Sequence, residues 1–142
     1  MNQSSNCDFS SPESVTRSFI ESMHQWEIES EQERRAARKT DDPASYQSKS
    51  MEKMNEIFLA FCTPKERKYG RQGSFQHPPE YDPEKEKITK TKEEGNLAQV
   101  ESEREAILRG GKYRYILKRM NERWLIDRLE HNDLDTWKPH IL

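Results

Sequence analysis

The sequence predicts an α+β domain in which two amphipathic helices pack on an antiparallel sheet. Apolar residues recur every three or four positions up to Cys62, which is the spacing of one helix face. The second half changes to alternating patterns, and residues 112–120 and 123–130 read as a hairpin around the polar turn Asn121-Glu122. Helices followed by strands, each with one apolar face, are typical of this fold class.

Length and composition predict one domain with a modest core. We expect residues 1–10 to form a flexible N-terminus and residues 11–142 to form the single domain. Because 31% of the residues are apolar and 35% are charged, the core must be small and its rim well solvated. The net charge of -2 lacks the one-sided field that nucleic acid or a membrane surface attracts, so we expect neither as a partner.

The sequence shows no signal for export and no pattern for a cofactor. Residues 1–6 lack the basic and apolar regions of a secretion signal, and the longest apolar run, 57–62, is too short to cross a membrane. Two cysteines form neither a disulfide framework nor a metal site, and the four histidines are scattered. No glycine-rich loop follows a strand. We therefore expect a cytoplasmic protein without a metal or another cofactor.

The first helix is predicted to begin at Pro12. Ser11 provides the N-cap hydroxyl, and proline suits the first helical position. Five apolar residues then follow at helical spacing and predict the buried face: Val15, Phe19, Ile20, Met23 and Trp26. About one turn later the sequence becomes almost entirely charged. We expect a solvated helical extension there, in which Glu31 pairs with Arg34 and Arg35.

A second helix is predicted to begin at an acidic cap, either Asp41 or Asp42, with Pro43 in its first turn. It should end before Thr63-Pro64, because the residue that precedes a proline avoids helical backbone angles. Its apolar face is predicted from helical spacing to consist of Met51, Met54, Ile57, Phe58, Phe61 and Cys62. The two helices need an extended surface to cover these faces, and the later strands provide it.

Strands are expected after a long irregular stretch. Residues 63–83 contain four prolines and few aliphatic residues, and within them we allow one short strand at 72–76. Residues 86–92 read as an edge strand guarded by lysines, and a turn at 93–96 leads into a strand at 97–103. With the hairpin this gives four or five antiparallel strands.

Alternation predicts which side of the hairpin faces the helices. Tyr113, Tyr115 and Leu117 share one face of the first strand. On the second strand, alternation separates two groups: Trp124 and Ile126 on the core side, with Leu125, Asp127 and Leu129 on the other. For residues 131–142 the sequence allows two alternatives: a short segment that closes the fold, or an exposed tail.

The loop at 77–83 combines prolines with an aromatic residue between two acids. Prolines restrict the backbone and so reduce the entropy that a loop loses when it docks on a partner. We therefore predict Glu80, Tyr81 and Asp82 as partner-binding residues, with Tyr81 as an aromatic anchor. The alternative is that Tyr81 pins the loop to its own domain.

Several short motifs resemble a known family by their order and spacing. They are Ser11-Pro12-Glu13, Trp26-Glu27, Phe61-Cys62-Thr63, Pro78-Pro79-Glu80-Tyr81-Asp82-Pro83, Tyr113-Arg114-Tyr115 and Trp124-Leu125-Ile126-Asp127. Together they cover residues 11 to about 137 and resemble the immunity proteins of bacterial polymorphic toxin systems with the nuclear-transport-factor-2-like, or cystatin-like, cone fold. The resemblance implies N-terminal helices on a curved antiparallel sheet, and an antitoxin that neutralises a cognate protein toxin by binding it. It assigns no binding residues, and homodimerisation is left open.

Two other functions are open to the same fold. Ketosteroid-isomerase-like and polyketide-cyclase-like enzymes place an acidic base and hydroxyl donors inside the cone. In that reading Asp127 is the base, with its pKa raised by an apolar setting, and Tyr113 and Tyr115 are the donors. The low apolar fraction argues against a generous cavity, and Asp127 then simply bonds an arginine or a backbone amide. A partner-binding or dimerisation module is the third alternative.

Overall fold

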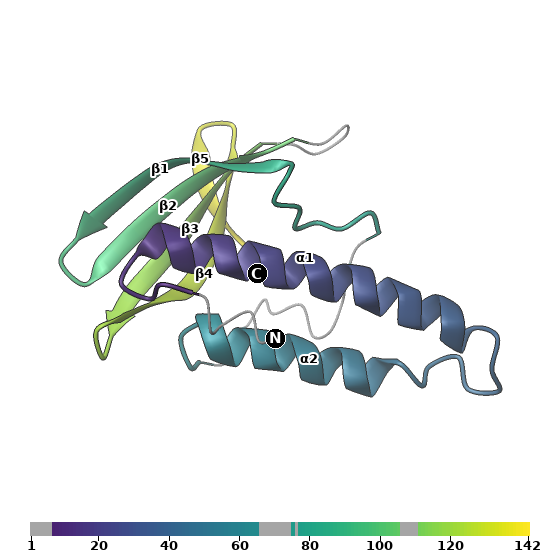
Figure 1. The fold of residues 1–142 in the computed structure, drawn as a ribbon. Coiled ribbons are helices and arrows are strands. Elements are labelled where there is room, and N and C mark those ends of the chain that lie inside the picture. Colours follow the sequence, from purple (N-terminus) through teal and green to yellow (C-terminus); the bar gives the residue numbers. More distant parts are fainter. Residues whose placement is uncertain (1–6, 66–74, 76, 106–110) are drawn as a thin grey trace.

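The computed structural model describes residues 7–65, 75, 77–105 and 111–142. Its elements are the helices α1 (Pro12–Ala37) and α2 (Gln47–Phe61), and the strands β1 (Glu86–Glu94), β2 (Leu97–Arg104), β3 (Gly111–Met120), β4 (Arg123–Asp133) and β5 (Thr136–His140). The strands form one antiparallel sheet in the order β1-β2-β3-β4-β5, and both helices lie on one side of it (Figure 1). The predicted α+β fold class is confirmed.

Helix α1 begins and extends as predicted. The backbone amide of Ser14 donates to Ser11 Oγ at 3.2 Å, which completes the N-cap. In the charged extension, Arg34 and Arg35 both pair with Glu31, at 2.6 and 3.0 Å. The hydrogen bond from Arg34 is the main reason that the pKa of Glu31 falls to about 2. The extension is therefore held by the predicted ion pairs.

Helix α2 begins later than predicted. Its first residue is Gln47, so neither Asp41 nor Asp42 caps it, and Pro43 lies before the helix in the connection. The backbone of this connection satisfies itself through turns, one of which joins the amide of Ser45 to the carbonyl of Asp42. These turns pair backbone amide and carbonyl groups that would otherwise belong to the first turn of a capped helix. The predicted end is confirmed, since the last helical residue precedes Cys62.

The buried face of α2 is narrower than predicted. Trp26 Nε1 donates to the carbonyl oxygen of Ser50 at 2.7 Å, and the Ser50 and Ser30 hydroxyls are 2.6 Å apart. This close approach turns Ser50 and Met54 toward α1. The next position along a helix is rotated by about 100°, so Met51, predicted to be buried, is 42% exposed.

A β-bulge changes the predicted faces of β4. The register with β3 shifts between Ile126 and Arg128, which leaves Asp127 as an extra residue without an opposite partner. The extra residue resets the alternation, so Leu129 pairs with Tyr115 on the core side and is 1% exposed. The prediction that Leu129 faces away from the core was wrong, because strict alternation does not include a bulge.

The core lies between the helices and the sheet, and the hairpin contributes much of it. The turn residues Asn121 and Glu122 have φ values of 51° and 63°, as a two-residue hairpin turn requires. The largest fully buried apolar side chains come from both layers: Trp26, Trp124, Tyr81, Tyr115, Phe19, Phe61, Met23, Leu117, Ile126, Leu129 and Val15. The predicted core positions of the hairpin are thus confirmed, and Leu129 joins them.

The two ends of the described chain also join the fold. Phe9, within the segment that we expected to be flexible, stacks on Phe61 at 6.0 Å, and its carbonyl accepts from the Trp124 amide at 2.9 Å. The C-terminal tail supplies the last part of β4 and all of β5, so it closes the sheet. The short strand allowed at 72–76 lies outside the described residues apart from Phe75.

Candidate functional site

The aromatic residue of the predicted binding loop lies in the core. The side chain of Tyr81 is fully buried, and its ring meets the ring of Phe19 edge-on at 5.5 Å. Its backbone amide donates to Glu27 Oε1 at 2.9 Å, and its carbonyl oxygen lies 2.7 Å from His24 Nδ1. This burial matches the alternative in which Tyr81 pins the loop to its own domain. The partner contact at Tyr81 stays a prediction.

The two acids beside Tyr81 are partly exposed and also bonded within the chain. Asp82 Oδ1 accepts a hydrogen bond from the Glu84 amide at 2.9 Å, which shapes the turn before β1. Glu80 Oε2 accepts from Arg104 at 2.9 Å and lies 3.1 Å from His140 Nε2. The loop therefore connects α1 to the sheet and to the C-terminal strand.

A buried polar cluster surrounds Arg104. Arg104 Nε donates to Glu86 Oε1 at 3.0 Å, and the other oxygen of Glu86 accepts from Ser102 Oγ at 2.6 Å and from the Tyr115 hydroxyl at 2.8 Å. Burial, followed by the charge of Glu86, raises the pKa of Tyr115 well above its ordinary value, so its hydroxyl stays protonated and donates. The described hydrogen bonds thus join Ser102, Arg104 and Tyr115 to the carboxylate of Glu86.

Arg104 also brings together residues that we had predicted for different roles. Its guanidinium carbon lies 3.9 Å from the ring centroid of Tyr113 and 4.9 Å from that of Tyr81. Cations at this distance are attracted to the faces of aromatic rings. One arginine thus fixes Tyr81 of the predicted binding loop and Tyr113 of the enzyme reading in the same buried cluster.

Arg104 and Glu86 were not predicted from the sequence, although it contains a signal for them. The alternation that places Ala98 and Val100 of β2 in the core places Ser102 and Arg104 on the same face. A buried arginine needs a carboxylate, and Glu86 is the residue directly opposite it in β1. Predicting this pair also requires the register between the two predicted strands, which the sequence pattern did not supply.

Asp127 belongs to a separate set of contacts. Thr63 Oγ1 donates to Asp127 Oδ1 at 2.9 Å, Lys65 Nζ lies 3.0 Å from Oδ2, and Lys118 Nζ lies 3.8 Å from Oδ1. Burial acts to raise the pKa of Asp127, but the hydrogen bonds from Lys65 and Thr63 outweigh it and the pKa is lowered. The carboxylate is therefore ionised and paired with cations at neutral pH.

The described contacts of the three residues in the enzyme reading fall into separate groups. Lys118, which meets Asp127, projects from the face of β3 opposite to Tyr113 and Tyr115, because side chains alternate along a strand. The described partners of the Tyr115 hydroxyl are Glu86 and Arg104, neither of which contacts Asp127 in the described part of the chain. The predicted acid, Asp127, thus contacts Lys65 and Thr63, whereas the predicted donor Tyr115 contacts Glu86.

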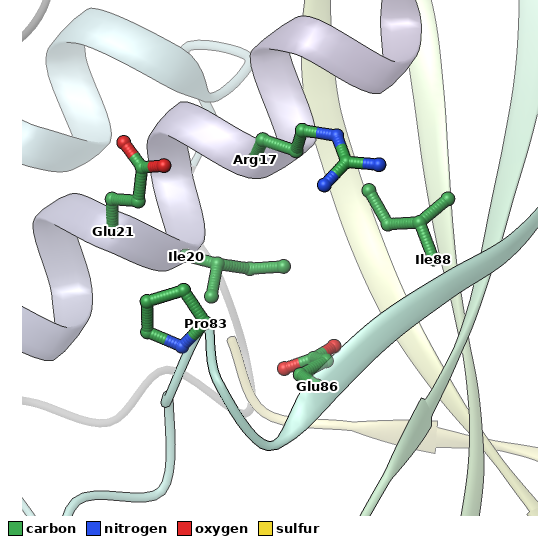
Figure 2. A pocket seen from close by; sticks show the side chains of 6 residues that line it. All are labelled: Arg17, Ile20, Glu21, Pro83, Glu86 and Ile88. Atoms are coloured by element: carbon green, nitrogen blue, oxygen red, sulfur yellow. The ribbon is translucent and has the colours of Figure 1, made fainter.

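A small pocket lies between α1 and β1. Figure 2 shows its lining, which consists of Arg17, Ile20, Glu21, Pro83, Glu86 and Ile88. Its volume is about 30 Å³, which is room for about two water molecules. This pocket is too small for an organic substrate.

Comparison with known proteins decides the family. A family model described as NTF2 fold immunity protein matches residues 11–140. The chain belongs to this family. It is also 30% identical over 139 residues to Immunity protein RhsIA of Dickeya dadantii, a match that covers 95% of this chain and 98% of that protein. No solved structure matches the chain. The resemblance stated from the sequence motifs is confirmed.

In this immunity protein, replacing Asp127 with asparagine is expected to lower the free energy of unfolding at pH 7 by about 1–2 kcal/mol. A carboxyl group whose pKa is lowered by folding contributes stability above its unfolded pKa, and this contribution is lost as the pH falls through the folded value. The difference between the variant and the native protein should therefore shrink below about pH 4. Urea unfolding at pH 7 and pH 3 measures this difference in the free energy of unfolding. Asp41→Asn, at an exposed position, serves as the control. An equal loss at both pH values would contradict the ion pairing.

Proposed function

We propose that this immunity protein neutralises a cognate bacterial toxin by binding it directly and blocking it, without catalysis. Membership of the immunity family over residues 11–140 carries the proposal. The relative from Dickeya dadantii, which is named as an immunity protein and matches over nearly its whole length, supports the same role. Steric occlusion, helped by complementary charge, is the mechanism that we infer.

The geometry gives less support to an enzyme. Asp127 is ionised and held by Lys65, whereas a general base of the ketosteroid-isomerase type needs an acceptor that is free to take a proton. The hydroxyl of Tyr115 is already engaged by Glu86. Between α1 and β1 the pocket has room for about two water molecules. We therefore assign these residues to the stability of the fold.

The remaining predictions concern location and partners. We propose that the protein acts in the cytoplasm on a protein toxin and uses neither nucleic acid, a membrane nor a cofactor. Over the described ranges, neither helix is long and apolar enough to cross a membrane. Glu80, Tyr81 and Asp82 stay predicted as partner-binding residues; Glu80 and Asp82 are partly exposed, whereas the Tyr81 side chain is buried. Homodimerisation is a separate prediction that light scattering of the purified protein checks.

Titration of the toxin tests this proposal. The candidate toxin encoded beside the gene is purified, and its residual activity is measured against increasing amounts of the immunity protein. A blocking partner is expected to abolish activity at one molar equivalent, and activity should return when the complex is separated under denaturing conditions and the toxin is refolded. Complete inactivation by about one hundredth of an equivalent, progressing with time, would instead identify catalytic turnover.

A further inference from the structure

The turn between β4 and β5 presents a leucine in an unfavourable backbone conformation. Leu134 has a φ of 51° and is 93% exposed, and Asp135 follows with a φ of 66°. Two successive left-handed residues form the kind of hairpin turn that favours Asn-Gly, because bulkier side chains are strained there. At the corresponding position, the turn between β3 and β4 has Asn121 and the turn between β1 and β2 has Gly95, which both tolerate a positive φ.

The fold itself gains nothing from leucine at this position. A side chain that is 93% exposed makes almost no packing contacts, so hydrophobic burial does not offset the strain. An asparagine would fit the left-handed conformation better and would also be better solvated. The stability of the turn therefore gives no reason for a leucine at this position.

A second feature lies beside this turn, on the face of the sheet away from the helices. The guanidinium carbon of Arg114 lies 4.2 Å from the ring centroid of Trp137. Two nitrogens of Arg114 hold Glu130 Oε1 at 2.8 and 2.7 Å, so the arginine is fixed in place. Trp137 pairs with Asn132, one step from the turn. Tryptophan and arginine dominate the binding energy of many interfaces, and ordered side chains lose little entropy on binding.

We propose that Leu134, Trp137 and Arg114 form the surface that binds the toxin. Leu134 inserts into an apolar pocket of the toxin, and the Trp137–Arg114 pair packs at the rim of that pocket. This inference rests on the proposed function and names its contact surface. A second copy of the chain is the poorer occupant, because the described pocket between α1 and β1 is too small for a leucine side chain.

The substitution Leu134→Asn tests this surface with two readouts of opposite sign. It should raise the melting temperature by about 2–4 °C, because it relieves strain. It should weaken toxin binding at least about tenfold, which is the loss expected for a buried apolar anchor. Leu59→Asn is the matched control, since Leu59 is a 79% exposed leucine on α2, and it should leave the affinity unchanged. Trp137→Ala should weaken binding as Leu134→Asn does.

Isothermal titration of each variant with the purified toxin measures these affinities. Unchanged affinity in both Leu134→Asn and Trp137→Ala, with native binding intact, overturns the proposed surface and leaves the proposed function in place. Failure of the native protein to bind the toxin overturns the proposed function instead. Light scattering completes the test, because loss of a dimer in Leu134→Asn with unchanged toxin affinity would assign the surface to a second copy of the chain and contradict the inference.

Discussion

Replacing Glu86 with alanine is expected to lower the free energy of unfolding by about 3 kcal/mol. The variant leaves Arg104 buried without the carboxylate that it contacts at 3.0 Å, and it removes the acceptor of Ser102 and Tyr115. Breaking a buried ion pair by removing one partner costs about 3–5 kcal/mol. The lower end applies because Glu80 still lies 2.9 Å from the same guanidinium. Urea unfolding at pH 7 measures the loss.

A double-mutant cycle separates the pair from its surroundings. Arg104→Met should be destabilising by itself, and Glu86→Leu combined with Arg104→Met should cost less than the sum of the two single changes. The matched control is Lys90→Ala with Glu101→Ala, two directly opposite residues farther along β1 and β2 that are not buried. Each control change should stay within about 0.5 kcal/mol. Additive losses in the buried pair would show that Glu86 and Arg104 are not coupled.

The parts of the fold that the sequence predicted depend on local signals. Ser11 and Pro12 begin α1 through groups only a few residues apart. The hairpin follows from a turn at Asn121-Glu122, which tolerates positive φ, between two strands of alternating apolar residues. Such features need no knowledge of distant segments, so they can be read in a single pass along the chain.

The features that were missed depend on contacts between distant segments. The face of α2 is set where Ser50 meets Ser30 and Trp26 of α1, and no residue near Met51 indicates this. The bulge at Asp127 lies where the segment after α2 joins β4 and Thr63 bonds the carboxylate. Both features arise only when the helices and the sheet are brought together.

The loop at 77–83 illustrates why the candidate site was harder to predict than the fold. A proline-stiffened loop with an aromatic residue suits docking on a partner, and it suits docking on its own core equally well. The deciding contacts of Tyr81 come from Phe19 and Glu27 in α1, more than fifty positions earlier in the chain. Tyr81→Ala should therefore be judged first by its melting temperature, and any loss of toxin affinity should be corrected for unfolding.

Replacing Trp124 with alanine is expected to lower the free energy of unfolding by about 3–5 kcal/mol. Its side chain is 1% exposed in the core, and its backbone amide holds the N-terminal segment through the carbonyl of Phe9. Removing a large buried ring forfeits its transfer free energy and leaves a cavity. Strand β4 cannot move to close it, because at Trp124 it is paired with Arg119 of β3 and bonded to Phe9. The melting temperature should fall by more than about 10 °C.

Trp137→Ala is the matched control, because it removes the same ring from a partly exposed position on the other face of the sheet. It should cost about 1 kcal/mol or less, since little apolar surface returns to water. A loss below about 1 kcal/mol in Trp124→Ala would contradict its place in the core and the register that puts it there. The two tryptophans thus separate the two faces of the sheet: Trp124 should control the stability of the domain, and Trp137 should control its affinity for the toxin.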